Sequence, residues 1–246
     1  MAPPGRSSSD DVPPPLRLTW YGHACFRLEG DGLSIVTDPY TPEQAGLEPV
    51  RERANVVVMS SALDEAHSCA AMVPGSPRVL NALDAVGTPV AIAPHVVVEA
   101  IPASEGADRP DDPKANALYR FELGGLAICH MGDIGTPLSD AQLAPLRGRV
   151  DVLLALAGGG LTIPLPSLDE AIDAIGPRIV VPMHHRTPSL RYVVGPVEDF
   201  LARHGSDRVV MHAGSTVDLE AEALPGHLEI HVLQPAADPA ANARAT

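Results

Sequence analysis

Three apolar runs, each followed by polar residues, lie between residues 127 and 185. The first run is followed by His130 and Asp133, the second by the glycines 158–160, and the third by His184 and His185. Continuous apolar runs of this length are typical of strands buried on both faces. A helix-like segment, SLDEAIDAIGP, separates the second run from the third. This alternation predicts an α/β scaffold whose functional residues stand where strands end.

The residue types at these strand ends are those that bind metal ions and transfer protons near neutral pH. Each of them also has a structural explanation. His130 and His184 could be core histidines with satisfied polar atoms, and Asp133 could be a turn residue. The occurrence of all three at neighbouring strand ends favours a functional site.

Five short segments along the chain carry a family resemblance. They are residues 22–26 (GHACF), 37–40 (TDPY), 130–135 (HMGDIG), 150–154 (VDVLL) and 181–184 (VPMH). In this order they resemble the metallo-β-lactamase superfamily, in particular its branch of metal-dependent hydrolases that includes lactonase-like members. The resemblance implies an α/β fold, a four-layer αββα sandwich, over residues 16–235. It also implies that His23 lies near a metal centre without being a ligand.

The metal motif of that family is degenerate in this chain. Active members carry HxHxDH after the strand that corresponds to residues 55–60, and this motif can hold one or two zinc ions. Here Ser61 stands at the first His and Leu63 at the second, while Glu65 stands at the Asp. The third His is replaced by Ala66, and His67 comes one position late.

A further family ligand, a His after the strand at residues 96–102, is also missing. The acidic loop at residues 105–114 is predicted to be a solvated turn. Two ligand positions of the family survive: Asp133, the bridging carboxylate in active members, and His184, the last His. Two ligands do not make a zinc site, which needs three or four.

The sequence leaves three accounts of the metal open. The chain could hold no metal, it could use the cavity for metal-free work, or it could hold one ion in a rebuilt set of Glu65, His67, Asp133 and His184. Carboxylates in such a set would suit manganese or magnesium as well as zinc. We expect well below one equivalent of zinc in the purified protein. Asp133 is also predicted to cap backbone donors, so Asp133→Ala should cost about 1–3 kcal/mol even without metal.

The direction of the His67 side chain separates these accounts. Residues 63–66 contain neither Gly nor Pro and are compatible with a helix. In a helix, an offset of one residue rotates a side chain by about 100°. The sequence therefore predicts that His67 faces away, which would leave Asp133 and His184 beside a cavity lined by Ser61 and Leu63.

Further residues near strand ends are candidates for lining the cleft, without an assigned catalytic role: His23, Asp38, Ser61, His130 and His185. The loss of ligands favours a non-catalytic or repurposed member that binds a small molecule or a protein in the old cleft. The alternative is a divergent hydrolase of an ester, lactone or phosphoester that uses one metal. If the chain is an enzyme, it is a hydrolase.

The composition indicates which classes of partner the protein is expected to bind and where it is expected to be located. The formal net charge of −14 disfavours nucleic acid and anionic membrane surfaces as partners, because phosphates would be repelled. No apolar run is long enough to span a bilayer, and residues 1–15 lack the apolar core of a signal peptide. The three cysteines are expected to be reduced thiols of a cytoplasmic protein. Residues 1–15 and 236–246 are predicted to be disordered.

Overall fold

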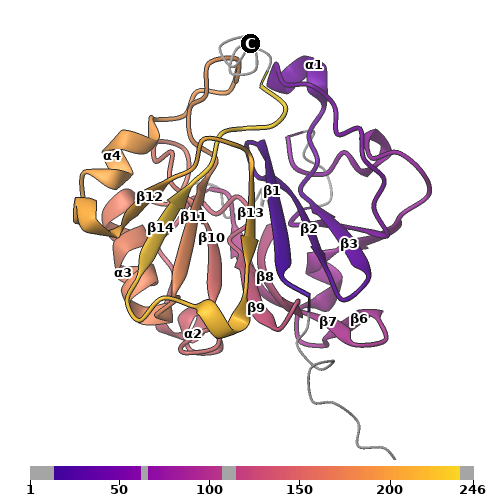
Figure 1. The fold of residues 1–246 in the computed structure, drawn as a ribbon, viewed down its shortest axis with the longest axis horizontal. Coiled ribbons are helices and arrows are strands. Elements are labelled where there is room, and N and C mark those ends of the chain that lie inside the picture. The colour runs from indigo at the N-terminus through magenta and orange to yellow at the C-terminus, as the bar shows by residue number, and fades with distance from the viewer. Residues whose placement is uncertain (1–13, 62–65, 107–114, 239–246) are drawn as a thin grey trace, which may run out of the picture.

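The computed structural model describes residues 14–61, 66–106 and 115–238 of the chain. Two β-sheets face each other in the centre of the molecule (Figure 1). The smaller sheet has the strand order β13-β1-β2-β3-β4-β5. Its strands are β1 (Leu16–Gly22), β2 (Cys25–Gly30), β3 (Leu33–Thr37), β4 (Val56–Met59), β5 (Arg78–Asn81) and β13 (Thr216–Leu219).

The larger sheet has the strand order β12-β14-β11-β10-β9-β8-β7-β6. Its strands are β6 (Val90–Ala93), β7 (Val96–Ser104), β8 (Ala115–Leu123), β9 (Leu126–His130), β10 (Val152–Leu156), β11 (Ile179–Met183), β12 (Val209–Met211) and β14 (Glu229–Val232). The neighbours β9, β10 and β11 run parallel and are buried along their whole length. Their carboxyl ends therefore meet at one edge of the sheet, as the apolar runs predicted.

Short helices cover the outer faces of the two sheets. The α-helices are α1 (Pro42–Ala45), α2 (Asp140–Leu143), α3 (Leu165–Ile175) and α4 (Val197–Leu201), and the 3-10 helices are η1 (Ala70–Met72), η2 (Ala82–Ala85), η3 (Ser206–Arg208) and η4 (Ala221–Ala223). In Figure 1, α2, α3 and α4 lie along the larger sheet, and α1 lies on the side of the smaller one. The predicted four-layer αββα sandwich is confirmed. Among the described helices, none is long and apolar enough to cross a bilayer.

The helix starts depend on local capping. Ser139 caps α2 in a reciprocal arrangement with Gln142. Helix α3 begins after Pro164 and carries Pro166 in its first turn. Proline suits a position at the start of a helix because its fixed φ is already helical and its missing N–H would have no partner there.

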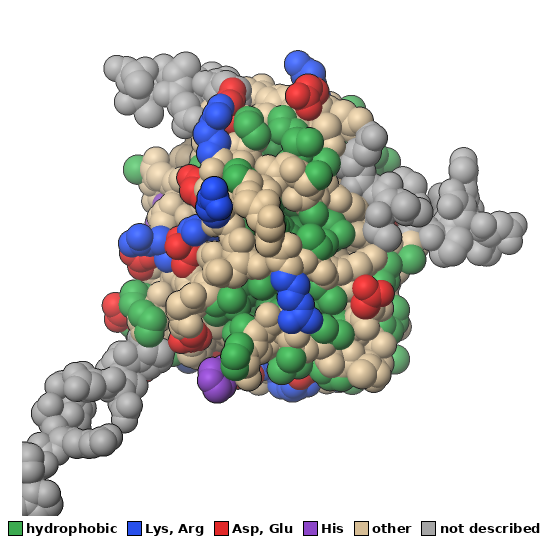
Figure 2. Space-filling model, turned by 90° about the vertical axis from the view of Figure 1, so that its right-hand side faces the viewer, with side chains coloured by type: hydrophobic (Ala, Val, Ile, Leu, Met, Phe, Trp, Pro, Cys, Tyr) green, Lys and Arg blue, Asp and Glu red, His purple; other side chains and the backbone are tan. Residues whose placement is uncertain are grey.

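The main core fills the space between the sheets. Its largest fully buried side chains include Trp20, Phe26, Tyr119 and Phe121. A second apolar cluster on the smaller sheet includes Tyr21, Cys25, Tyr40 and Val57. Figure 2 shows the right-hand face of Figure 1, where charged side chains of both signs are scattered among apolar and uncharged ones.

Residues 236–238, at the start of the segment expected to be a disordered tail, are hydrogen-bonded to the domain. The backbone N–H of Ala236 donates to Trp20 O at 2.9 Å, and that of Glu48 donates to Ala237 O at 2.7 Å. The carboxylate of Asp238, which is fully buried, accepts from the backbone N–H of Ser189 at 3.1 Å. Residues 236–238 are thus part of the packed domain, because polar and apolar contacts both hold them there. The rest of the predicted tail, residues 239–246, lies outside the described residues, as do residues 1–13.

Candidate metal centre

Two histidines with left-handed backbone connect the two sheets. His23 lies in the tight connection between β1 and β2 with a φ of 52°, and His184 follows β11 with a φ of 56°. The backbone N–H of His184 donates to His23 O at 2.9 Å. Left-handed backbone is uncommon outside glycine, and such residues gather at functional sites where the surrounding structure holds them.

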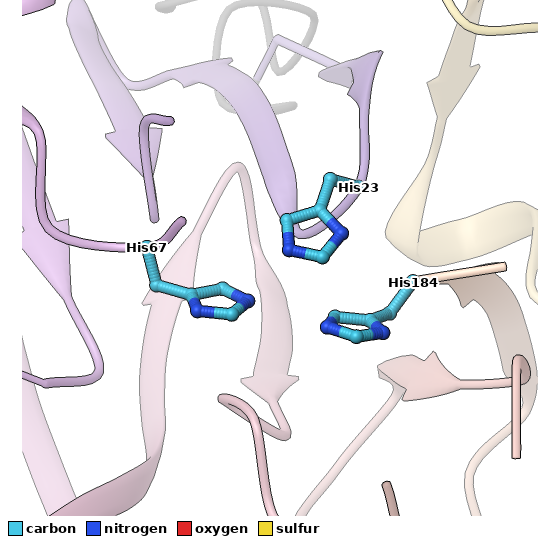
Figure 3. Close-up of side chains that lie close together, drawn as sticks. All are labelled: His23, His67 and His184. Atoms are coloured by element: carbon cyan, nitrogen blue, oxygen red, sulfur yellow. The ribbon is translucent and has the colours of Figure 1, made fainter. Parts of the chain in front are cut away.

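Three buried imidazole rings gather at this point (Figure 3). The ring centroids of His23 and His184 are 4.0 Å apart, and those of His23 and His67 are 4.6 Å apart. The rings of His67 and His184 stack with centroids 5.4 Å apart. One nitrogen from each ring lies within 4.8 Å of the other two. The three residues come from the connection between β1 and β2, the residue after β11 and the segment after β4, so the fold brings together distant parts of the sequence.

The prediction that His67 faces away is wrong. Its Nδ1 lies 3.8 Å from Oδ2 of Asp133, and its ring points toward His184. Ala66 and His67 form a turn, not a helix, so the offset of one residue is absorbed. The chain just beyond is anchored by a backbone hydrogen bond from Cys69 N to Pro39 O at 2.8 Å. Glu65 and Leu63, the other predicted residues of this loop, lie outside the described residues.

Asp133 faces two of the histidines. Its Oδ1 lies 3.4 Å from Nε2 of His184, and its side chain is 18% exposed. Among the described residues, no backbone N–H donates to this carboxylate, so the predicted capping role is not found. The carboxylate is available to a cation at the surface of an otherwise buried cluster.

Glu105 is a member of the cluster that the sequence analysis missed. One carboxylate oxygen of Glu105 lies within 4.8 Å of a ligand atom of His67 and of Asp133. Its position directly after β7, at a strand end, was the available signal, but its side chain was assigned to a solvated turn. The rest of that predicted acidic loop, residues 107–114, lies outside the described residues.

The donor set fits a divalent cation. Both ring nitrogens of His23 are buried without a hydrogen-bond partner among the described residues, which is costly unless another group binds them. Burial, together with the neighbouring His184 and His67, holds the pKa of His23 well below its usual value. Its imidazole is therefore neutral and offers a lone pair. Neutral imidazoles beside carboxylates are ligands that zinc and manganese accept.

Comparison with known proteins gives the family. Residues 17–184 match the family described as "Beta-lactamase superfamily domain", which is more than half of the chain. The chain belongs to the beta-lactamase superfamily.

Two relatives and one solved structure cover most of this chain and nearly all of their own length. A UPF0173 metal-dependent hydrolase of Carboxydothermus hydrogenoformans is 26% identical over 227 residues, covering 83% of this chain and 100% of the relative. Another, of Methanoculleus marisnigri, is 28% identical and covers 84% of this chain and 98% of the relative. A solved structure of a Thermotoga maritima protein of the metallo-beta-lactamase superfamily is 30% identical, with a TM-score of 0.69 and coverage of 89% and 98%.

Two predicted cleft residues of this superfamily member are buried in the structure. Asp38 is fully buried and accepts from the Ser60 backbone at 2.8 Å and from its hydroxyl at 2.6 Å. Burial raises the pKa of the Asp38 carboxyl. His130 is equally buried; its Nε2 donates to Ala24 O at 2.9 Å, and its Nδ1 accepts from Gly132 N at 2.9 Å. The polar atoms of Asp38 and His130 are therefore already hydrogen-bonded within the domain, and neither side chain belongs to the histidine cluster.

Two further cleft candidates also lie beside the cluster without joining it. The Ser61 hydroxyl lies 3.1 Å from the hydroxyl of Ser68. The ring of His185 packs on Trp20 with centroids 4.8 Å apart, and burial lowers its pKa to about 4. Of the five predicted cleft residues, His23 is the one whose ring belongs to the cluster.

Proposed function

We propose that this protein is a metal-dependent hydrolase that uses one divalent cation. The ion would be held by His67, Asp133 and His184, drawn from two overlapping groups of donors, His23 with His67 and His184, and His67 with Glu105 and Asp133. The observation that carries the proposal is the convergence of His67 on Asp133 and His184, although the HxHxDH motif is degenerate. The relatives named as metal-dependent hydrolases support it.

A divalent cation in such a centre polarises a substrate oxygen and makes water more acidic. The protein's own part is to hold the donors and to move protons. Asp133, whose carboxylate is partly exposed, can accept a proton from an attacking water molecule. The buried imidazoles of His23 and His67 keep bulk water from the inner side of the centre.

The charges of the centre favour an uncharged substrate. Two carboxylates, Asp133 and Glu105, lie on one side of the histidine cluster. With one dication bound, they leave no net positive charge to attract a phosphate. Among the three substrate classes suggested by the sequence, a carboxylic ester or lactone therefore fits better than a phosphoester.

The non-catalytic alternative has one specific observation in its favour. Ser61, which occupies the first ligand position of the family, is buried against Ser68 and offers no imidazole. A non-catalytic member of the family would bind a small molecule or a protein partner in the cleft. The two functions differ in whether a bound ion is needed for turnover.

Turnover of model substrates tests the proposal. Protein stripped of metal and reloaded with Mn²⁺ or Zn²⁺ should hydrolyse an aryl ester or a lactone, and His67→Ala should lose at least about a hundredfold in kcat/KM. His95→Ala, an exposed histidine outside the cluster, is the matched control and should behave like the wild type. Activity that survives metal removal, or that is unchanged in His67→Ala, would rule the proposal out.

A further inference from the structure

Asn116 is a fully buried side chain near the start of β8 that connects three loops around the centre. Its Nδ2 donates to Oε1 of Glu105 at 3.1 Å and to Oγ of Ser60 at 3.4 Å. Its Oδ1 accepts from the backbone N–H of Asp133 at 3.1 Å. One amide thus contacts the loops that follow β4, β7 and β9.

The chemistry of these partners requires an amide. The backbone N–H of Asp133 can only donate, and the ionised Glu105 carboxylate can only accept, so the orientation of the amide is determined by its surroundings. An aspartate at position 116 would still accept from Asp133 but could not donate to Glu105. An aliphatic side chain would leave both partners unpaired in a buried place.

Two glycines leave room for this arrangement. A Cβ on Gly132 would lie 2.1 Å from Oδ1 of Asn116, so no side chain fits there. A Cβ on Gly135 would lie 1.9 Å from the carbonyl oxygen of Glu105. The backbone N–H of Gly135 also donates to Ser104 O at 3.0 Å. The loops that carry Glu105 and Asp133 are therefore packed directly against each other.

Glu105 reaches the histidine cluster on one side only. It shares a possible cation position with His67 and Asp133, whereas the other possible position consists of His23, His67 and His184. The first position is rich in carboxylate oxygens and the second in imidazole nitrogens. Hard cations such as Mn²⁺ prefer oxygen ligands, and zinc binds imidazole well.

We propose that Asn116 is a positioning residue that directs the Glu105 carboxylate toward His67 and Asp133, and that this carboxylate makes the centre bind Mn²⁺ well relative to Zn²⁺. The inference rests on the proposed function, because it assumes that the cluster holds a cation. It goes further by assigning the preference for one ion over another to Glu105 and Asn116. Both residues lie outside the segment that corresponds to HxHxDH.

Calorimetric titration of metal-free protein with Mn²⁺ and with Zn²⁺ tests this inference. Glu105→Gln and Asn116→Asp should each weaken Mn²⁺ binding by about tenfold and Zn²⁺ binding by less than about threefold. The double variant should bind Mn²⁺ no more weakly than Glu105→Gln alone, since Asn116 acts through Glu105. The Mn²⁺ electron paramagnetic resonance spectrum should change in the same way in both single variants.

The controls separate this inference from the proposed function. Glu122→Gln, a glutamate on β8 whose side chain is 67% exposed, should leave both affinities unchanged. Should Asn116→Asp fail to fold by circular dichroism, Asn116→Ala takes its place, with the same expected loss of Mn²⁺ affinity. A wild type that binds neither ion overturns the proposed function and this inference together. A wild type that binds Mn²⁺, with Asn116 variants that bind it equally well, or with losses that multiply in the double variant, overturns this inference alone.

Discussion

His67 and Asp133 approach each other across the two sheets, with Nδ1 of His67 3.8 Å from Oδ2 of Asp133. His67 follows β4 of the smaller sheet, and Asp133 follows β9 of the larger sheet. The contact lies at the edge where both sheets present the ends of their strands. It brings His67 to Asp133, which also faces His184, so three possible donors lie close together.

Asp133 should matter for metal binding more than for folding. Its carboxylate faces His67 and His184, and among the described residues no backbone N–H depends on it. Asp133→Asn should therefore change the unfolding free energy of metal-free protein by less than about 1 kcal/mol, in place of the larger loss that a capping role predicted. The affinity for Mn²⁺ should fall by at least about tenfold. Urea unfolding in the presence of EDTA and calorimetric titration measure the two quantities; a large loss of stability without metal would show that the capping role is real.

Asp38 should be essential for stability. It is fully buried and accepts hydrogen bonds from the backbone and the hydroxyl of Ser60 and, at 3.3 Å, from the hydroxyl of Tyr119. Asp38→Ala would leave these donors unpaired, at a cost of about 2–4 kcal/mol in the unfolding free energy. Asp140→Ala, which removes an almost fully exposed carboxylate, should cost less than about 1 kcal/mol. Equal urea midpoints for the two variants would refute this role of Asp38.

Gly132 and Gly148 form a matched pair with φ values of 63° and 65°. A Cβ on Gly132 would clash with Asn116, whereas nothing lies within 4 Å of a Cβ on Gly148. Gly148→Ala should cost about 1–2 kcal/mol for the left-handed backbone alone. Gly132→Ala should cost about 1–3 kcal/mol more, because Asn116 must move and the new Cβ would also lie 2.7 Å from the carbonyl oxygen of Ala117. Denaturant unfolding of both variants gives the difference, and similar losses would mean that the contact with Asn116 imposes no constraint.

The three thiols should differ in reactivity. Cys25 and Cys129 are fully buried, and burial raises the pKa of Cys129 to about 12 and that of Cys25 well above its usual value. At pH 8 both are almost entirely protonated, and the thiolate is the reactive form. Cys69 is only half-buried, so it alone should react with a disulfide reagent in the native protein, and all three should react in guanidinium. Fast modification of two or more thiols before unfolding would contradict the packing described here.

The fold was largely predictable because its signals are local. The runs that form β9, β10 and β11 are apolar except for His130 at the end of β9. His184 follows β11 directly, and Asp133 lies in the loop after β9. The strand β13 was missed because its alternation of polar and apolar residues spans only 4 residues, and the strand exists by pairing with β1. Pairing between residues so far apart in sequence leaves little trace in the local pattern.

The site was predictable only in part, because contacts distant in sequence decide it. The direction of His67 depends on a turn and on the anchor between Cys69 and Pro39, neither of which has a sequence signature. In the sequence, Glu105 is one acidic loop residue among several, and its hydrogen bond with the distant Asn116 leaves no local signal. His130 and Asp38 have the residue types of a site, but a buried network uses their polar atoms.

The metal content of the wild type and of His67→Ala, measured by elemental analysis after purification without chelator, tests whether the cluster holds an ion. A single cation site predicts close to one equivalent of a divalent metal in the wild type, with zinc well below one equivalent, since histidine and carboxylate donors lie within reach of one another. It predicts less than about a tenth of an equivalent in His67→Ala, with an unchanged circular dichroism spectrum. A metal-free wild type that also fails to take up Mn²⁺ or Zn²⁺, or a His67→Ala variant that retains its metal, would contradict it.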